Sequence, residues 1–377
     1  IITEKTGLGL TEYLRPRLFD KLGIGDVFWE KCPMGIEKGG WGLYIRPQDI
    51  AKIGLLVMQN GVWNGEQIVP AAWIKQSCAP QVSVPEGLGD YDYGYQIWVG
   101  RKCKSFLFNG MFGQNVLGFP GSGVLVVSNA GNSETFQQNP FYSITSGFFG
   151  KALPKPEKCP FIKRAFICAS TAKYLRREKK TAFFRYASQH RFIRSLDGFS
   201  YRCDASRTQA FGLYPFITQA MQNNYTSGLR EIAFSFKNGK LSVTVFEKDD
   251  VNTFTVGFMR PEYTTLRFGN ETQLAAVSGQ FAYNEDDAAV IIIRINLLEM
   301  SNTRFIKLVF GKDTIDSIWY ESPGKEYIAA LASSFAGKRR IPSLVARDSA
   351  QLEYKLERVI EPHILFNRTA KNAQKST

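Results

Sequence analysis

Residues 232–245 read IAFSFKNGKLSVTV, and this stretch decides the fold expected for the second half of the chain. Apolar and polar residues alternate before and after Asn238-Gly239. Such alternation is typical of a half-buried β-strand, and Asn-Gly is the preferred dipeptide of a tight two-residue hairpin turn. The stretch therefore predicts an antiparallel hairpin that turns at Asn238-Gly239.

Further strand signals follow this hairpin at near-regular spacing. Strands are predicted at 253–258, 263–268, 274–283, 288–297, 305–310 and 317–321. Many short strands with turn residues between them are typical of a sandwich or a barrel. We therefore expect an all-β sandwich or open barrel over residues 196–324. A basic connector at 151–195 is expected before it, and a polar, basic tail at 325–377 after it, with one helix near 352–360.

The first 150 residues carry a different pattern, because their apolar residues first recur with a helical period. Helices are predicted at 1–22, 47–60 and 70–76. Thr11 is an early cap in the first of them, Pro47 suits the first turn of the second, and Gly61 supplies its left-handed stop. Strands separated by glycine turns are then predicted at 93–99, 105–109, 114–119 and 124–128. Helices followed by an antiparallel meander predict an α+β core over residues 1–150.

The composition limits the chemistry that this chain can carry out. The chain has 2 histidines, His190 in the predicted connector and His363 in the predicted tail. A Ser-His-Asp triad in the folded core and a histidine-rich metal site are therefore not expected. The sequence also lacks the glycine-rich phosphate-binding motifs, and we expect no cofactor. The reaction type still compatible with this composition is catalysis by a nucleophilic serine, with lysine or tyrosine as the group that accepts and donates its proton.

Charge and cysteine content bear on partners and on compartment. The formal net charge is +13, with many of the basic residues gathered in 151–194. A solvated linker is the simpler interpretation, and binding to nucleic acid is the alternative. The 6 cysteines form no C-x-x-C pair, so free thiols in a reducing compartment such as the cytoplasm are expected. Residues 288–298 form an apolar run that falls well short of the roughly 18 residues of a membrane span.

Three segments of the first half occur in a fixed order. They are TGLGLTEYLRPRLFDKLGI at 6–24, GGWGLYIRPQDIAKIG at 39–54 followed by NGVWNG at 60–65, and YGYQIW at 93–98. Together they resemble the class C β-lactamase and penicillin-binding-protein family of serine hydrolases, in the part of the fold that follows its tyrosine motif. The resemblance implies a partial β-lactamase/transpeptidase-like core. Residues 196–324 then resemble the accessory domain of some bacterial members.

The motifs of that family are S-x-x-K, then Y-x-N or S-x-N, then a K-T-G-like strand. No Y-x-N or S-x-N occurs in this chain, and an S-x-x-K from Ser170 to Lys173 lies in the basic connector after the third-motif strand. We interpret the match at Ser170 as a chance occurrence of the motif and not as a catalytic nucleophile. The resemblance therefore implies that the nucleophile lies upstream of residue 1 and that this chain alone is inactive.

The third motif falls at Phe108-Asn109-Gly110, which departs from K-T-G because Phe108 stands where a cationic side chain or histidine often stands. A glycine at position 110 would let the strand backbone approach a bound acyl group, although an ordinary glycine bulge is the alternative. The backbone N–H of Met111 is expected to form one half of an oxyanion hole. The expected substrate-binding residues are Tyr93, Tyr95, Phe108 and Asn109, with plain core packing as the alternative for the two tyrosines.

The sequence therefore predicts a serine hydrolase that acts on ester, amide or peptide-like bonds by an acyl-enzyme route, with a small-molecule or peptide-like substrate. A pseudoenzyme or binding module of the same fold is the first alternative, favoured by Phe108 and by the absent motifs. Nucleic-acid binding is the second alternative, and only the charge of the connector supports it.

Overall fold

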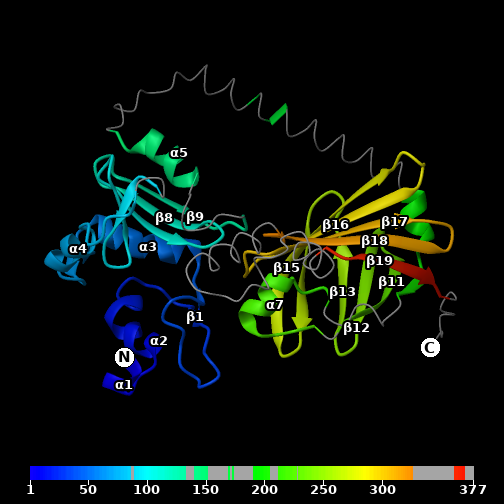
Figure 1. Cartoon of the computed structure of the whole chain (residues 1–377), viewed down its shortest axis with the longest axis horizontal. Helices are drawn as coiled ribbons and strands as arrows, with labels where there is room; N and C mark the ends of the chain where they lie inside the picture. The colour runs from blue at the N-terminus through cyan, green and yellow to red at the C-terminus, as the bar shows by residue number, and fades with distance from the viewer. Residues whose placement is uncertain are drawn as a thin grey trace, which may run out of the picture. The chain divides into compact units, whose positions relative to one another are not determined.

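The computed structural model describes residues 1–85, 89–132, 140–151, 169, 172–173, 190–203, 211–226, 228–325 and 361–369. The chain divides into two compact units, Ile1–Pro156 and Glu157–Thr377 (Figure 1). The α+β class is confirmed, and the strands of each sheet pair in antiparallel ladders. Among the described residues, no helix has both the length and the apolar character needed to cross a membrane. The predicted helix at 352–360 lies outside the described residues.

The chain starts with short helical pieces where one helix was predicted over residues 1–22. They are α1 (Ile2–Thr6), α2 (Leu10–Leu14) and the π-helix η1 (Arg15–Phe19). Gly7 ends the first piece, because it adopts a left-handed φ of 72° and its N–H bonds to the carbonyl of Thr3. Gly9, not Thr11, is the N-cap of α2. The apolar period continued across this break, so the sequence pattern concealed it.

The core of the first unit is a five-stranded sheet. Its strands, in sheet order, are β5 (Tyr91–Tyr93), β6 (Trp98–Gly100), β7 (Phe106–Gly110), β8 (Gln114–Phe119) and β9 (Val124–Ser128). The prediction of one strand over 93–99 was wrong, because β5 and β6 form a hairpin there. Gly94 donates to the carbonyl of Ile97 at 2.7 Å, and Gln96 has a left-handed φ of 59°.

Helices cover both faces of this sheet (Figure 1). Helix α5 (Pro140–Phe149) packs on one face, over a buried cluster of Tyr91, Leu107, Leu117, Phe119 and Tyr142. Helix α3 (Pro47–Met58) packs on the other. Gly54 makes this approach possible, because a Cβ atom there would lie 2.6 Å from Cγ1 of Val116. The predicted helix at 47–60 is therefore confirmed, and its apolar stripe contacts the sheet.

The remaining elements of the first unit are short. They are the β1–β2 ladder (Phe28–Trp29, Leu43–Tyr44), the β3–β4 ladder (Val62–Trp63, Glu66–Gln67) and α4 (Ala71–Ser77). A second buried cluster joins η1 to α3 and consists of Phe19, Leu22, Ile24 and Leu56. The helix predicted at 70–76 is confirmed as α4, displaced by one residue at each end.

The second unit contains a ten-stranded antiparallel sheet. Its strands are β10 (Ser200–Cys203), β11 (Leu229–Lys237), β12 (Lys240–Glu247), β13 (Val251–Val256), β14 (Glu262–Phe268), β15 (Glu271–Tyr283), β16 (Ala289–Leu297), β17 (Thr303–Phe310), β18 (Thr314–Ser322) and β19 (His363–Arg368). The hairpin predicted from the opening stretch is confirmed as β11–β12. Its turn residues Asn238 and Gly239 have φ values of 52° and 76°, as a type I′ turn requires.

This sheet nearly closes into a barrel. Strands β10 to β13 pair in chain order, as do strands β14 to β18, and β19 pairs with both β18 and β10, so β13 and β14 are the two ends of the sheet. Between the two ends, Gly257 forms a bridge to Ser278 of β15. The predicted tail is thus corrected at 363–368, because this segment is a strand of the sheet. Its inward residues Ile364 and Phe366 are buried, and their contact with the core supplies the stabilisation that a six-residue strand lacks on its own.

Candidate functional site

The predicted third-motif strand is β7, and its register fixes the position of each motif residue. Phe108 pairs with Val116, Asn109 with Asn115, and Gly110 with Gln114. On its other side, β6 pairs only with Phe106 and Leu107. Residues 108–110 therefore extend past the end of β6, and no strand in the described part of the chain pairs with them on that side.

Met111 begins the turn between β7 and β8. The next two residues, Phe112 and Gly113, have left-handed φ values of 64° and 85°, and the ring of Phe112 is buried. The turn therefore has a defined shape and holds the backbone of Met111 at the end of the strand. Whether its N–H serves as an oxyanion donor stays a prediction.

Gly110 has a packing role that the sequence did not reveal. A Cβ atom at this position would lie 2.8 Å from Cβ of Gln114 and 2.9 Å from its carbonyl oxygen. Both contacts are too close for a real side chain, so the β7–β8 hairpin itself requires glycine here. This supports the packing alternative for Gly110, and any substitution there would disturb the hairpin as well as a bound acyl group.

The expected substrate-binding residues do not lie on one face of the sheet. Tyr93 pairs with Trp98, which pairs with Leu107, so these three side chains share the face that α5 covers. Phe108 follows Leu107 and therefore points to the opposite face, toward α3. Tyr95 lies in the β5–β6 turn and stacks on Trp73 of α4, with ring centroids 5.4 Å apart. Because successive side chains of a strand point to opposite faces of the sheet, Tyr93 and Phe108 lie on different faces.

Asn109 shares the α5 side of the sheet, in a row with Asn115 and Ser128. Asn115 is buried and donates to the Ser128 hydroxyl at 3.4 Å, and Ser128 donates to the carbonyl of Gly113 at 3.0 Å. This row secures the β7–β8 turn against the neighbouring strand. Asn109 is the predicted site residue in this row, and it lies opposite Asn115 on β7.

A hydroxyl cluster that the sequence reading missed lies at the start of β7. Ser105 Oγ is 3.3 Å from the Tyr142 hydroxyl, and the Cys103 thiol donates to Ser105 at 3.3 Å. Burial raises the pKa of Tyr142, so this phenol keeps its proton and is a poor base for Ser105. The cluster joins α5 to the sheet.

The other residues singled out by the sequence lie apart from β7. Ser170 lies outside the described residues. His190 packs its ring against Phe236 at 5.0 Å, and His363 begins β19. Among the described residues, no group of three or more histidine, cysteine or acidic side chains could hold a metal ion.

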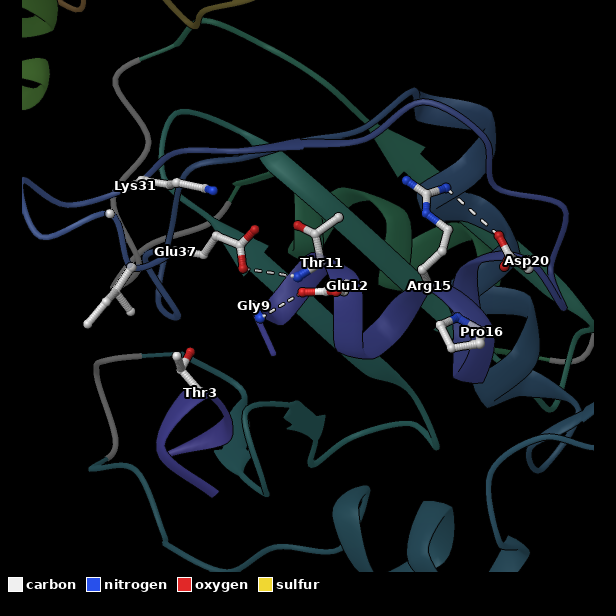
Figure 2. A pocket seen from close by; sticks show the side chains of 11 residues that line it. Thr3, Gly9, Thr11, Glu12, Arg15, Pro16, Asp20, Lys31 and Glu37 are labelled. Atoms are coloured by element: carbon white, nitrogen blue, oxygen red, sulfur yellow. Dashed lines mark hydrogen bonds and ion pairs between the residues drawn. The ribbon is translucent and has the colours of Figure 1, made fainter. Parts of the chain in front are cut away.

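A hollow of about 780 Å³ opens in the first unit between the N-terminal helices and the loop around residue 35 (Figure 2). Its volume falls in the range of roughly 300–1,000 Å³ that is common for ligand pockets. The lining residues are Thr3, Gly9, Thr11, Glu12, Arg15, Pro16, Asp20, Lys31, Gly35, Ile36 and Glu37. None of the site residues expected from the sequence is among them, although six of the lining residues belong to segment 6–24, which contributed to the family resemblance.

The charged groups of the hollow also hold the local backbone. Glu37 accepts the Thr11 N–H at 3.1 Å, and Glu12 accepts the Gly9 N–H at 3.4 Å (Figure 2). Arg15 donates to the carbonyl of Gly25 at 2.6 Å. The lining contains no serine, cysteine or histidine, and the carboxylates of Glu12 and Glu37 accept backbone N–H groups. Its chemistry suits binding of a polar or charged small molecule.

Comparison with known proteins identifies no family for this chain. No protein-family model matches it, and no curated protein does. One solved structure that it resembles is a Bacillus anthracis protein that carries the name of a 6-aminohexanoate-dimer hydrolase. The likeness has a TM-score of 0.35 and 24% sequence identity, and it covers 39% of this chain and 38% of that chain. One distant structural neighbour is thus named as a hydrolase. A score this low does not establish a common fold.

Proposed function

We propose that this chain forms the third-motif part of a serine hydrolase related to the class C β-lactamases, acting on ester, amide or peptide-like bonds. The nucleophilic serine and its lysine would come from residues outside 1–377. The observation that supports the proposal is the edge of β7 at 108–110, which extends past β6 in a sheet covered on both faces by helices. Such an edge can present backbone groups to an extended substrate.

The proposed reaction divides hydrolysis into two transfers. The serine oxygen attacks the substrate carbonyl and gives its proton to lysine or tyrosine, the leaving group departs with a proton, and water then cleaves the acyl-enzyme. Negative charge develops on the carbonyl oxygen in each transfer. A backbone donor such as Met111 N–H could stabilise that charge by about 3 kcal/mol. Such a donor does not depend on the side chain at 108, which is how Phe108 could be tolerated in place of a cationic residue.

Labelling with a fluorophosphonate probe tests the proposal. The 377-residue chain should not be labelled, whereas the protein encoded by the complete gene should be labelled on the serine of an S-x-x-K motif. In that longer protein, Asn109→Ala should lower the acylation rate at least tenfold, whereas Ser122→Ala, in the turn at the opposite end of β8, should leave the rate within about twofold. Labelling of Ser170, or a gene that encodes no such motif, would reject the proposal.

A binding module without catalysis is the second candidate. It is favoured by Phe108 in place of a cationic residue and by the hollow at Glu12 and Glu37, whose lining has charges but no serine, cysteine or histidine. The two candidates differ in one measurement. A binding module would bind a peptide-like ligand at equilibrium and release it unchanged, with no covalent intermediate in mass spectrometry of the complete protein.

A further inference from the structure

A buried ionic cluster lies inside the barrel-like sheet of the second unit. Arg304 of β17 is directly opposite Glu321 of β18, and Nη1 of the arginine is 3.2 Å from Oε2 of the glutamate. Their side chains are 1% and 0% exposed. Charges removed from water to this extent are tolerated only when they are paired and hydrogen-bonded, so the partners of these two groups indicate what they hold in place.

The partners belong to one segment, residues 211–226, which precedes β11. Arg304 donates to the carbonyl of Tyr214 at 2.7 Å, and Glu321 accepts the N–H groups of Phe216 and Ile217 at 2.7 and 3.1 Å. These N–H groups open helix α7 (Phe216–Gln222). The apolar side of the segment enters the core, where Tyr214 stacks on Phe268 with ring centroids 4.2 Å apart. The cluster therefore fastens the segment to the sheet.

Glu247, the last residue of β12, is the third charged group of the cluster and is 4% exposed. Its Oε1 accepts the N–H of Leu213 at 2.6 Å, and its Oε2 is buried without a hydrogen-bond partner among the described residues. A Cβ atom on Gly212 would lie 1.8 Å from Oε1, so only glycine lets the segment come this close. The backbone of Gly212 and Leu213 therefore packs directly against the carboxyl group of Glu247.

The charges in this cluster do not balance when both carboxyl groups are ionised, because one guanidinium faces two of them. Arg304 is committed to Glu321 at 3.2 Å. The other charge near Glu247 is that of Asp250, which has the same sign, and the described segment 211–226 contains no charged side chain. Burial also raises the pKa of Glu321, but Arg304 and the N–H groups of Ile217 and Phe216 oppose that shift. An uncompensated buried charge is costly, so Glu247, which has no ion-pair partner of its own in the cluster, gains most from holding a proton.

We propose that Glu247 is a proton-operated latch for residues 211–226. With its carboxyl group protonated, the segment stays closed on the sheet; when Glu247 ionises, the segment is released and the rings of Phe211 and Tyr214 leave the core. This function is independent of hydrolysis by the first unit.

The direction of the pH effect follows from proton binding. Burial raises the pKa of Glu247 in the closed form to about 7, against the opposing effects of the Leu213 N–H, Thr226 and Arg304. Release returns the carboxyl group to water, where its pKa is near 4.3. The closed form therefore binds more protons, and its advantage is complete below the lower pKa and is lost as pH rises through the higher one. Between these values the opening constant should rise about tenfold per pH unit.

Hydrogen exchange on the complete chain tests the latch. Exchange of the peptide covering 211–226 would be followed by mass spectrometry at pH 5.5, 6.5 and 7.5 and corrected for the intrinsic pH dependence of amide exchange. Protection should fall by about tenfold or more across this range in the natural protein. Glu247→Gln keeps an oxygen for Leu213 N–H but cannot ionise, so its protection should stay constant.

Matched variants and a direct titration complete the test. Glu262→Gln removes an exposed carboxylate that pairs with Lys240 and should behave like the natural protein. Gly212→Ala should leave the segment unprotected at every pH. The ¹³C resonance of the Glu247 carboxyl group should titrate near neutrality. An unchanged pH dependence in Glu247→Gln, a titration below pH 5, or loss of protection throughout the unit would each overturn the proposal.

Discussion

At the scale of single residues, Arg304 shows how burial changes the energy of an ion pair. Arg304→Met would leave Glu321 buried without its counter-ion, and the second unit should lose about 3–5 kcal/mol of unfolding free energy. Arg202→Met is the matched control, because its pair with Glu231 at 3.0 Å has a side chain 68% exposed and should change stability by less than about 1 kcal/mol. Urea unfolding measures both. Equal losses would contradict the assigned role of burial.

Replacing two helical glycines of the first unit by alanine should change its stability in opposite directions. Gly54→Ala places a Cβ atom 2.6 Å from Val116 and 3.0 Å from Leu125, and the forced separation of α3 from the sheet should cost about 1–3 kcal/mol. Gly147 in α5 has no atom within 4 Å of the added Cβ, so Gly147→Ala should stabilise by about 0.5–1 kcal/mol.

Thermal unfolding distinguishes the two glycine variants. Val116→Ala in the Gly54→Ala background should reduce the additional loss, because it removes the methyl group in conflict. A stabilising Gly54→Ala would show that α3 does not approach the sheet as closely as the 2.6 Å contact implies.

At the scale of elements, β19 decides whether the large sheet closes between β10 and β18. Phe366 is 0% exposed and its neighbour Leu365 is 55% exposed, although both belong to the same strand. Phe366→Ala should therefore cost about 3–5 kcal/mol by opening a cavity in the core, whereas Leu365→Ala should stay within about 0.5 kcal/mol. Guanidinium unfolding followed by circular dichroism checks the pair. Comparable losses would mean that the two side chains are not divided between core and solvent.

At the scale of the whole molecule, each hydrophobic cluster consists of residues from one unit. The cluster of the second unit runs from Ile193 to Phe366, and the two clusters of the first unit lie between Phe19 and Tyr142. We expect two unfolding transitions in calorimetry. Gly54→Ala should lower the transition of the first unit alone, and Phe366→Ala that of the second. A single transition that moves with both variants would contradict this independence.

Much of the sheet structure was predictable from local pattern. The strands at 114–119 and 124–128 were predicted with their observed bounds, and the β11–β12 hairpin was predicted from Asn238-Gly239. These elements combine strong alternation with turn residues whose backbone preference is local. The strand predicted at 93–99 was wrong because YGYQIW alternates as a strand does, whereas the Gly94 N–H bonds to the Ile97 carbonyl and Gln96 has a left-handed φ, so the chain turns there.

The candidate site was less accessible to sequence reasoning. The order of the motif-like segments placed Phe108, Asn109 and Gly110 on a strand, as observed for β7. Which of them share a face with Tyr93 depends on the register between three strands, and register is a long-range property. The hollow at Glu12 and Glu37 likewise joins residues that are apart in the chain, and of these two only Glu12 lies in one of the motif-like segments.

By itself the sequence determined the α+β class, the hairpin at Asn238-Gly239 and the helix at Pro47, because these depend on residue periodicity and on backbone preferences over a few positions. Only the tertiary structure decided that residues 363–368 are a strand of the large sheet and that Arg304, Glu321 and Glu247 share one buried space. A six-residue strand and three charged residues far apart in the chain have little local sequence signal. Their energies arise from neighbours distant in the chain, which exclude water and leave each group to the partners that the fold provides.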